Sequence, residues 1–292
     1  MVKYPKISIV TPSFNQVEFL EKTILSVLSQ GYPNIEYMII DGGSNDGSVD
    51  VIRRYAERLA YWESTPDRGQ SQAINKGFAK CTGEIMGWLN SDDTLENNAL
   101  FNVAAAFANK YTKIVYGDCR IVDTRGNELG IIRPGPISVW RLLNFHIANS
   151  IPPQPSIYFR SECLRKVGGI KEDLHYGMDY DLWLRLADRY AFLYVPQILS
   201  NYRFHDKSKS VRDGGFNNFA PEWTKVANEF VKRKNIVFRW WRNVKLEIEK
   251  HQGESGRLWI WLKVIAGCCK TAAFRLVRQM FQTGTGSGRC IR

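Results

Sequence analysis

The stretch GWLNSDDTLEN, residues 87–97, places two adjacent carboxylates, Asp92 and Asp93, directly after an apolar run. Adjacent carboxylates at the end of a strand repel each other and are costly to desolvate. They can be N-caps that favour the dipole of a following helix. They can also hold a hard divalent cation such as Mg2+ or Mn2+, which takes oxygen ligands from one or two protein carboxylates and from substrate phosphates.

A second polar cluster, IIDGGSNDGS at residues 39–48, places Asp41 after another apolar run. A tight turn between a strand and a helix explains the glycines. It does not explain a carboxylate at the inner end of the strand, which can accept the imide N–H of uracil or thymine. The chain contains neither GxGxxG nor GxxxxGK[ST], which disfavours a dinucleotide-binding fold and a P-loop.

Both clusters lie between alternating elements. Apolar runs predict strands at 6–12, 35–44, 61–64 and 84–90, and helical spacing predicts helices at 17–31, 48–60 and 71–83. This alternation predicts a mostly parallel, twisted sheet with flanking helices. Ligands bind such sheets beyond the carboxyl ends of the strands. We therefore expect TPSFN, DGGSNDGS and NSDD to converge on one crevice.

The pattern changes after residue 98. The sequence predicts helices at 98–109, 137–146 and 179–190, a hairpin at 113–133, a proline-rich loop at 149–156, and two strands, AFLYVP and SNYRF. At 292 residues the chain can form one large α/β domain or a domain with an appendage.

The basic residues are concentrated in the C-terminal part. The net charge is +11, yet residues 1–213 hold 25 basic and 24 acidic side chains, whereas residues 214–292 hold 15 and 5. A basic tail favours an anionic partner. The six cysteines form no CxxC pair, which indicates reduced thiols. The N-terminus MVKYPKISIV has no apolar signal segment, so we expect a cytoplasmic protein.

The segment 257–281 has the pattern of a cationic amphipathic helix. Its five charges fall on one arc, and Trp261 lies on the opposite, apolar side. Lys263 and Lys270 interrupt the apolar run that a transmembrane helix needs. Contact with an anionic membrane surface and packing against the catalytic domain are both open. Nucleic acid is not an expected partner, since no binding module is recognised.

Six motifs in this order, VTPSFNQ, IIDGGSNDGS, DRGQSQAINKG, GWLNSDD, GMDYDLWLRLA and YRFHDKSKS, resemble glycosyltransferase family 2 over residues 5–212. Members of this family are inverting enzymes with the nucleotide-sugar-binding GT-A fold. The resemblance implies a GT-A catalytic domain at 1–213, divided into a nucleotide-sugar half (1–110) and an acceptor half (111–213). Residues 214–292 would be a basic helical extension.

The resemblance also assigns roles to individual residues. Nucleotide binding falls to Thr11, Pro12, Ser13, Asn15, Asp41, Arg68, Gln70, Asn75, Asn90 and Ser91. The metal, Mn2+ or Mg2+, would be held by Asp92 of the family's D-x-D element, with His205 as a second ligand. Asn90 stands where the first Asp is usual, so this position carries no charge.

Asp179 occupies the position of the family's catalytic base, although as an N-cap it needs no other function. A carboxylate within hydrogen-bond distance of the acceptor hydroxyl can take its proton, which contributes about 10²–10⁴-fold to the rate. Contacts with the diphosphate or the acceptor are assigned to Arg203, Lys207, Ser208, Asp118, Gln154 and Asp181.

These observations predict an inverting glycosyltransferase that uses a UDP- or dTDP-sugar. The acceptor would be a hydroxyl of a polysaccharide or lipid-linked glycan in bacterial cell-surface synthesis, and the enzyme would sit peripherally on the inner face of the plasma membrane. Two alternatives remain: a nucleotidyltransferase, which should carry a glycine-rich N-terminal loop that VTPSFNQ lacks, and a non-catalytic nucleotide-sugar-binding module.

Overall fold

The computed structural model describes residues 4–146, 150–209, 211, 216–234 and 238. The chain divides into two compact units, Met1–Ala227 and Asn228–Arg292. Everything below concerns the first unit unless stated otherwise. Its described residues form a sheet in the order β3-β2-β1-β4-β8-β6-β9-β5, with β7 paired to β6.

The N-terminal half alternates strands and helices, as predicted. Its elements are β1 (Ile7–Ser13), α1 (Val17–Leu28), β2 (Ile35–Asp41), α2 (Ser48–Arg54), η1 (Ala56–Arg58), β3 (Tyr61–Ser64), α3 (Gln70–Lys80) and β4 (Ile85–Trp88). Strand β1 pairs in parallel with β2 and β4, and β2 pairs in parallel with β3. The carboxyl ends of these four strands therefore lie at one edge of the sheet.

The second half adds mostly antiparallel strands. Its elements are β5 (Thr94–Leu95), α4 (Ala99–Ala106), β6 (Ile114–Val122), β7 (Glu128–Ile132), α5 (Val139–Leu143), η2 (Gln154–Ser156), β8 (Ile157–Arg160), α6 (Ser161–Val167), α7 (Met178–Ala187), β9 (Phe192–Arg203) and α8 (Phe216–Lys232). Strand β8 runs antiparallel to both β4 and β6, so it joins the two halves into one sheet.

Strand β9 corrects one prediction. The sequence indicated two short strands, but the structure has one strand of 12 residues paired in parallel with β6. The register shifts so that Gly117 pairs with Val195 and Asp118 with Ile198, which leaves Pro196 outside the ladder. Because proline has no N–H to donate, a bulge at this point lets the strand continue through it.

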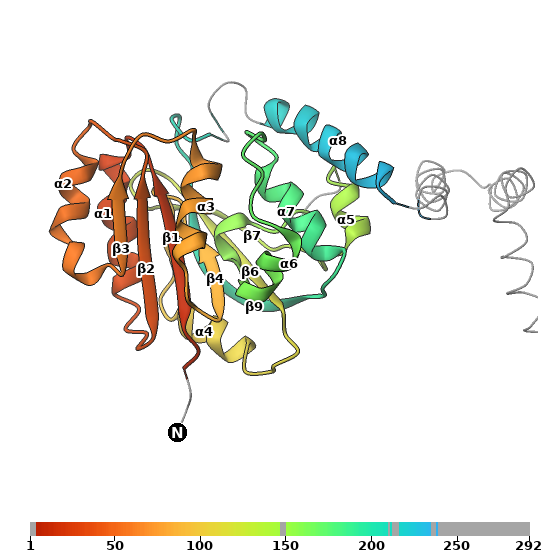
Figure 1. Cartoon of the computed structure of the whole chain (residues 1–292), viewed down its shortest axis with the longest axis horizontal. Coiled ribbons are helices and arrows are strands. Elements are labelled where there is room, and N and C mark those ends of the chain that lie inside the picture. Colours follow the sequence, from red (N-terminus) through yellow and green to blue (C-terminus); the bar gives the residue numbers. More distant parts are fainter. Residues whose placement is uncertain (1–3, 147–149, 210, 212–215, 235–237, 239–292) are drawn as a thin grey trace, which may run out of the picture. The chain divides into compact units, whose positions relative to one another are not determined.

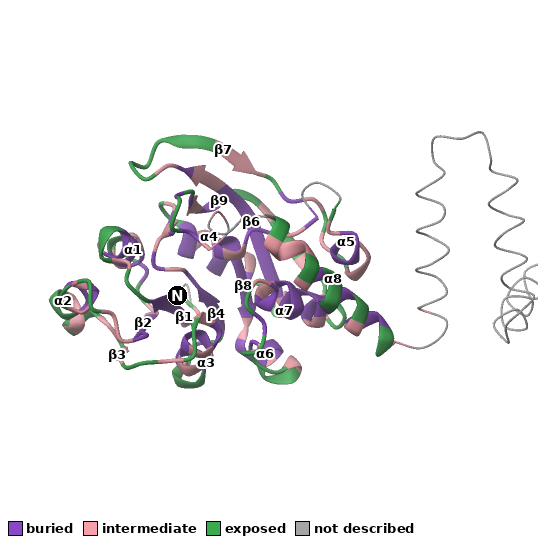
Figure 2. Cartoon of the chain, turned by 90° about the horizontal axis from the view of Figure 1, so that it is seen from above, coloured by how far each residue is buried: buried purple, intermediate pink, exposed green. Residues whose placement is uncertain are grey.

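Helices cover both faces of the sheet. Figure 2 shows α1 and α4 on one face and α3, α6 and α7 on the other, and Figure 1 shows the same elements along the chain. Helix α3 lies close to β1, since a Cβ on Gly77 would stand 2.4 Å from Val10 Cγ1. On that face Trp88 of β4 stacks on Trp183 of α7, with ring centroids 5.3 Å apart. This packing fixes α7 against the strand that leads into the Asp92 loop.

Helix α8 begins in the segment predicted as a tail. Within the first unit its Trp223 stacks on Tyr180 of α7 at a centroid distance of 5.3 Å. The amphipathic segment expected at 257–281 lies outside the described residues, so its membrane contact stays a prediction. Among the described helices, none is long and apolar enough to cross a membrane.

Candidate active site

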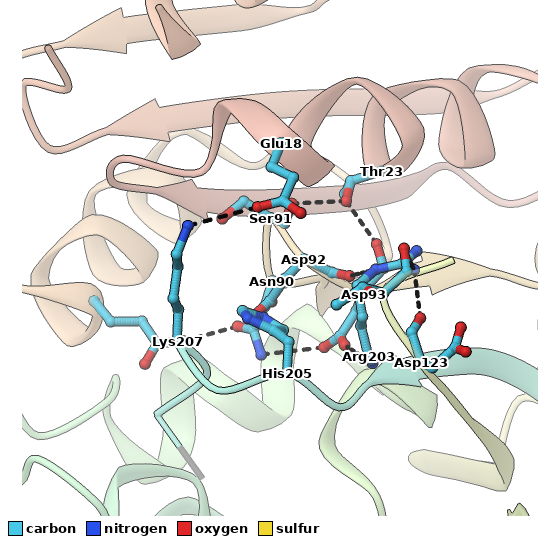
Figure 3. A network of polar contacts seen from close by, with 12 residues as sticks. Glu18, Thr23, Asn90, Ser91, Asp92, Asp93, Asp123, Arg203, His205 and Lys207 are labelled. Atoms are coloured by element: carbon cyan, nitrogen blue, oxygen red, sulfur yellow. Dashed lines mark hydrogen bonds and ion pairs between the residues drawn. The ribbon is translucent and has the colours of Figure 1, made fainter. Parts of the chain in front are cut away.

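The loop after β4 is fixed from the side of α1. The Leu89 N–H donates to the Val10 carbonyl, which continues the β1–β4 ladder for one more residue. The Thr23 hydroxyl of α1 lies against two carbonyls of the loop, 2.9 Å from that of Ser91 and 2.7 Å from that of Asp93. Figure 3 shows this loop between α1 and the end of β9. These contacts fix the backbone of the loop that carries Asp92 and Asp93.

Asp93 points inward and is 1% exposed. Its Oδ1 accepts the backbone N–H of Arg203, and its Oδ2 accepts from Asn90 Nδ2 at 3.3 Å. Burial raises the pKa of Asp93 well above its ordinary value, and the negative charge of Asp92 raises it further. Asp93 thus ties β9 to the loop.

Asp92 points the other way and meets His205. Its Oδ2 lies 3.1 Å from His205 Nε2, and the imidazole ring lies 4.7 Å from the ring of Phe19 on α1. Phe19 and the Asp92 carboxylate therefore both contact the His205 ring. Figure 3 shows the side chains of Asp92 and His205 next to each other.

A divalent cation fits this pair by its chemistry. A carboxylate oxygen and an imidazole nitrogen 3.1 Å apart can both reach one cation, whose bonds to such ligands are about 2.0–2.2 Å. The described residues contain no group of three or more His, Cys, Asp or Glu that could hold a metal. Substrate oxygens and water would have to complete the coordination, as is usual for Mg2+.

Arg203, which the resemblance assigned to the diphosphate, lies buried at the base of the Asp92 loop. It is 3% exposed, and its guanidinium donates to the carbonyls of Asp92, Asp123 and Thr124. It also lies over the ring of Phe19 at 5.1 Å. These contacts give Arg203 a structural role at the base of the loop. Contact of Arg203 with a diphosphate stays a prediction.

Lys207 and Ser208 follow His205. Lys207 is exposed, and its Nζ lies 3.6 Å from Glu18 Oε2 at the start of α1. Ser208 is 3% exposed, and its Oγ has no hydrogen-bond partner among the described residues, as is also the case for the Oγ of Ser13, the last residue of β1. A buried hydroxyl without a partner costs about 1–3 kcal/mol, so both oxygens are suited to meet a ligand or water.

Asn90 is the centre of a row of amides. Its Oδ1 accepts from Gln70 Nε2 at 2.8 Å, and its Nδ2 donates to Gln154 Oε1 at 3.0 Å. Gln154 Nε2 in turn donates to the Trp88 carbonyl at 2.8 Å, and Lys209 Nζ donates to Gln70 Oε1 at 3.2 Å. The row links α3, the β4 loop and η2, so Gln70, Asn90 and Gln154 are brought together.

Asp41 organises its own loop. The carboxylate accepts from the N–H groups of Gly43 and Ser44 and from the hydroxyls of Ser44 and Ser64. Three of these donors, including the Ser64 hydroxyl of β3, contact Oδ2, and only the Ser44 hydroxyl contacts Oδ1. Beside it, a cavity of about 640 Å³ is lined by residues that include Ser44, Asn45, Trp62 and Ser64. Recognition of a base by Asp41 stays a prediction.

Three further residues assigned to the nucleotide have hydrogen-bond partners within the protein. Thr11 Oγ1 lies 3.0 Å from the Tyr37 hydroxyl, inside the core. Asn15 has φ +51°, and its Oδ1 accepts from the Asn45 N–H, which joins the loops after β1 and β2. Asn75 is bonded through both side-chain atoms to the backbone of Ile170.

Two further residues hold the start of the site together. Arg68 is exposed, and its Nη2 lies 2.6 Å from Glu172 Oε2. Pro12 is buried in β1 next to Ser13, whose backbone pairs with Asp41. The loops after β1, β2, β3 and β4 are thus cross-linked at the edge that the sequence predicted.

Asp179 lies in the first turn of α7 and is half-buried. Burial raises the pKa of its carboxyl above the ordinary value, while a hydrogen bond from the Tyr180 N–H and the charge of Lys209 act in the opposite direction. A raised pKa suits a group that must accept a proton near neutral pH. The row from Lys209 through Gln70 to Asn90 connects this helix start to the Asp92 loop.

Asp181 and Asp118 are engaged in ion pairs. The Asp181 carboxylate binds Lys171 Nζ at 2.5 Å and Arg185 Nε at 2.6 Å and is 5% exposed, so it holds the α6–α7 connection. Asp118 Oδ1 accepts from the Tyr194 hydroxyl at 2.6 Å, and its Oδ2 lies 3.7 Å from Arg133 Nε. Both carboxylates are occupied by structural partners, and their acceptor contacts stay predictions.

Three residues that matter in this structure were not predicted. Thr23, Lys209 and Glu222 contact the Asp92 loop, Gln70 and the start of α7, respectively. Lys209 lies inside the motif YRFHDKSKS, which could have drawn attention to it. Thr23 and Glu222 carry no local signal, because their partners lie 45 to 70 residues away.

The fold and this site define a GT-A-type α/β protein. The chain belongs to glycosyl transferase family 2, because the sequence model of this family matches residues 8–172. An uncharacterized glycosyltransferase of Rickettsia typhi is 26% identical over 247 residues, which cover 80% of this chain and 76% of that protein. An uncharacterized glycosyltransferase of Mycobacterium tuberculosis is 31% identical over 192 residues, 64% of this chain and 71% of the relative.

Other relatives are longer. The O-antigen biosynthesis protein RfbC of Myxococcus xanthus is 27% identical over 237 residues, covering 79% of this chain and only 18% of that protein. Against further Rickettsia glycosyltransferases this chain spans between 32% and 64% of their length. The match therefore concerns one part of several larger proteins.

Two solved structures share the fold. S. aureus TarS 1–349 in complex with UDP-GlcNAc superposes with a TM-score of 0.64 at 13% identity, covering 90% of this chain and 79% of TarS 1–349. The mannosyltransferase PcManGT from Pyrobaculum calidifontis, in complex with GDP-Man and Mn2+, gives a TM-score of 0.55 at 18% identity, with 92% and 87% covered. The predicted family and fold class are confirmed.

Proposed function

We propose that this protein is an inverting glycosyltransferase that moves a sugar from a nucleoside diphosphate donor to an acceptor hydroxyl. The observation that supports this most directly is the pairing of Asp92 with His205 beyond the carboxyl end of β4. The two residues form the only candidate for a shared cation that we recognise in the described part of this site. A divalent cation bound there would act as a Lewis acid on the leaving diphosphate.

The transfer is a single displacement. The acceptor oxygen forms a bond to the anomeric carbon as the bond to the diphosphate oxygen breaks, and the electron pair leaves with the diphosphate. The proton of the acceptor hydroxyl passes to the Asp179 carboxylate. Lys207 and Ser208 follow His205 closely in sequence and supply a cation and a hydroxyl for the diphosphate.

The donor we propose is a UDP- or dTDP-sugar, because the Asp41 carboxylate can accept the imide N–H of either base. The complexes of similar folds with UDP-GlcNAc and GDP-Man support nucleotide-sugar binding as a class. For the acceptor we propose a growing cell-surface polysaccharide or its lipid-linked precursor, in line with the O-antigen relative. The basic tail would place the enzyme on the inner face of the plasma membrane.

The first experiment screens donors. Purified full-length protein is heated with UDP-GlcNAc, UDP-glucose, dTDP-glucose or GDP-mannose, each with Mn2+ or with EDTA. A donor that binds only the folded protein raises Tm. Release of the nucleoside diphosphate is then measured for that donor. We expect Mn2+-dependent release from a uridine or thymidine donor.

The matched pair of variants is Asp179→Asn and Asp188→Asn, at the two ends of α7. The first should keep donor binding and lose about 10²–10⁴-fold in turnover, whereas the exposed Asp188 should tolerate the change. Donor binding without turnover in the wild type would favour the non-catalytic module. Pyrophosphate release from a nucleoside triphosphate would favour the nucleotidyltransferase.

A further inference from the structure

The start of helix α7 is held by a carboxylate from another helix. Its N-cap residue, Gly177, makes no side-chain cap. Instead, Glu222 of α8 accepts the N–H groups of His175, Tyr176 and Gly177, the first at 3.1 Å and the second at 2.5 Å. Successive backbone N–H groups of this kind form a concave anion site, here filled by a side chain of the same protein.

Gly177 permits this contact. A Cβ at position 177 would stand 3.2 Å from Glu222 Oε2 and 3.5 Å from Trp223 Cδ1, so a larger residue would require the Glu222 carboxylate to shift. Trp223 also stabilises this turn, because its Nε1 donates to the Tyr176 carbonyl at 3.2 Å and its ring stacks on Tyr180. Two adjacent residues of α8 thus clamp the segment 175–180 that carries Asp179.

A cation approaches the same helix start from the other side. Lys209 follows β9, lies 5.7 Å from the centre of the Tyr176 ring, and donates to Gln70 Oε1 at 3.2 Å. Gln70 continues to Asn90 in the Asp92 loop. Lys209 therefore links the turn before α7, the helix of the proposed base Asp179, to Gln70 in the proposed donor site.

We propose that Glu222 and Lys209 are positioning residues for Asp179. Glu222 fixes the helix turn from which Asp179 projects, and Lys209, over the Tyr176 ring of the same turn, places a positive charge beside it. This inference rests on the proposed function only in taking Asp179 as the proton acceptor.

The charges around Asp179 act in opposite directions. The positive charge of Lys209 lowers the pKa of Asp179, and the negative charge of Glu222 raises it. From α3, the group that faces this turn is the neutral Ser71 hydroxyl, 2.8 Å from Met178 Sδ. The Tyr180 N–H also donates to Asp179 and lowers its pKa. Removing the charge of Lys209 should therefore raise the pKa of Asp179, and removing the charge of Glu222 should lower it.

The test uses the full chain with the donor that the screen identifies, or with UDP-GlcNAc if several bind. Lys209→Met should shift the acid limb of the kcat/KM profile for UDP release to higher pH by about one unit, and Lys209→Arg should restore it. Glu222→Gln should shift the same limb to lower pH while kcat at the plateau falls about tenfold, because the turn is less firmly held. Lys225→Met and Glu57→Gln, at exposed positions, are the charge-matched controls.

A second readout does not depend on activity. The carboxyl of Asp179 is titrated by ¹³C NMR in protein labelled at aspartate, with its signal assigned from Asp179→Asn. Opposite displacements of this signal in Lys209→Met and Glu222→Gln support the inference. If the pKa of Asp179 is the same in both variants as in the wild type, the inference is wrong. If Asp179→Asn turns over normally while the displacements are present, the proposed base is wrong and the charge relationship stands.

Discussion

His205 Nε2 lies 3.1 Å from Asp92 Oδ2, although 113 residues separate them in the chain. The contact depends on β9, whose last residue, Arg203, is bonded through its backbone N–H to Asp93 and through its guanidinium to the Asp92 carbonyl. These bonds join the end of β9 to the Asp92 loop. The distance between Asp92 and His205 is therefore set by the neighbouring residues and not by the attraction between the two side chains.

Replacing His205 by Ala should change the Mn2+ dependence of activity more than the stability of the folded protein. Removing one of two protein ligands should raise the Mn2+ concentration needed for half-maximal nucleoside diphosphate release about 10- to 100-fold, an effect typical of groups that hold or orient a metal ligand. The measurement is a Mn2+ titration at saturating donor. His146→Ala, at an exposed position after α5, is the control. An unchanged Mn2+ requirement would exclude His205 as a ligand.

Restoring the family's usual aspartate by Asn90→Asp should destabilise the protein. The new carboxylate would face the Gln154 oxygen, now 3.0 Å from Asn90 Nδ2, and would lie close to Asp93. We expect a loss of about 1–3 kcal/mol in urea unfolding at pH 7. The new carboxyl would have a raised pKa in the folded state, so the loss should shrink as pH falls toward 4. Asn109→Asp, at an exposed position, should show no such pH dependence.

Replacing Arg203 by Lys should cost stability and leave donor affinity nearly unchanged. A lysine cannot reach the three carbonyls that the planar guanidinium binds. The buried carbonyls would lose their partners, and we expect a loss of about 2–4 kcal/mol in the free energy of unfolding. Urea unfolding gives the stability, and calorimetric titration with donor gives Kd. A Kd raised more than about tenfold with unchanged stability would instead favour direct contact with the diphosphate.

The pH dependence of Asp179 should appear in both stability and activity. Burial raises the pKa of its carboxyl in the folded protein, so ionisation disfavours the folded state at every pH above the ordinary aspartate range. Asp179→Asn should therefore raise Tm at pH 7 and have little effect near pH 3, where both states are protonated. The wild-type kcat/KM should fall as pH drops through the raised pKa. Scanning calorimetry at several pH values tests the first expectation, and equal Tm values at pH 7 would contradict it.

Membrane contact of the tail should depend on charge. Full-length protein should float with vesicles that contain phosphatidylserine and should float less in high salt, because exposed charges are screened. The variant Lys263→Gln/Lys270→Gln should float less than the wild type, whereas Lys110→Gln/Lys225→Gln in the first 227 residues should not. Flotation with neutral phosphatidylcholine vesicles to the same extent would contradict an electrostatic contact.

The amino-acid pattern was enough to predict the alternation of strands and helices and the edge of the sheet at which polar loops gather. Local patterns suffice for this: β1 is buried along its whole length, and each polar loop follows an apolar run. The six ordered motifs also sufficed to indicate the family. The aspartates at 41, 92 and 179 were found because each stands at the end or start of a recognisable element.

The partners of each polar group follow from the three-dimensional fold. Arg203 and Asp181 have the residue types of ligand contacts, and the fold gives both of them partners within the protein. Asn90 acquires its meaning from Gln70 and Gln154, which lie 20 and 64 residues away. A hydrogen bond is satisfied by whichever group the fold brings within about 3 Å, and that distance is set by packing of the helices on the sheet, not by spacing along the chain.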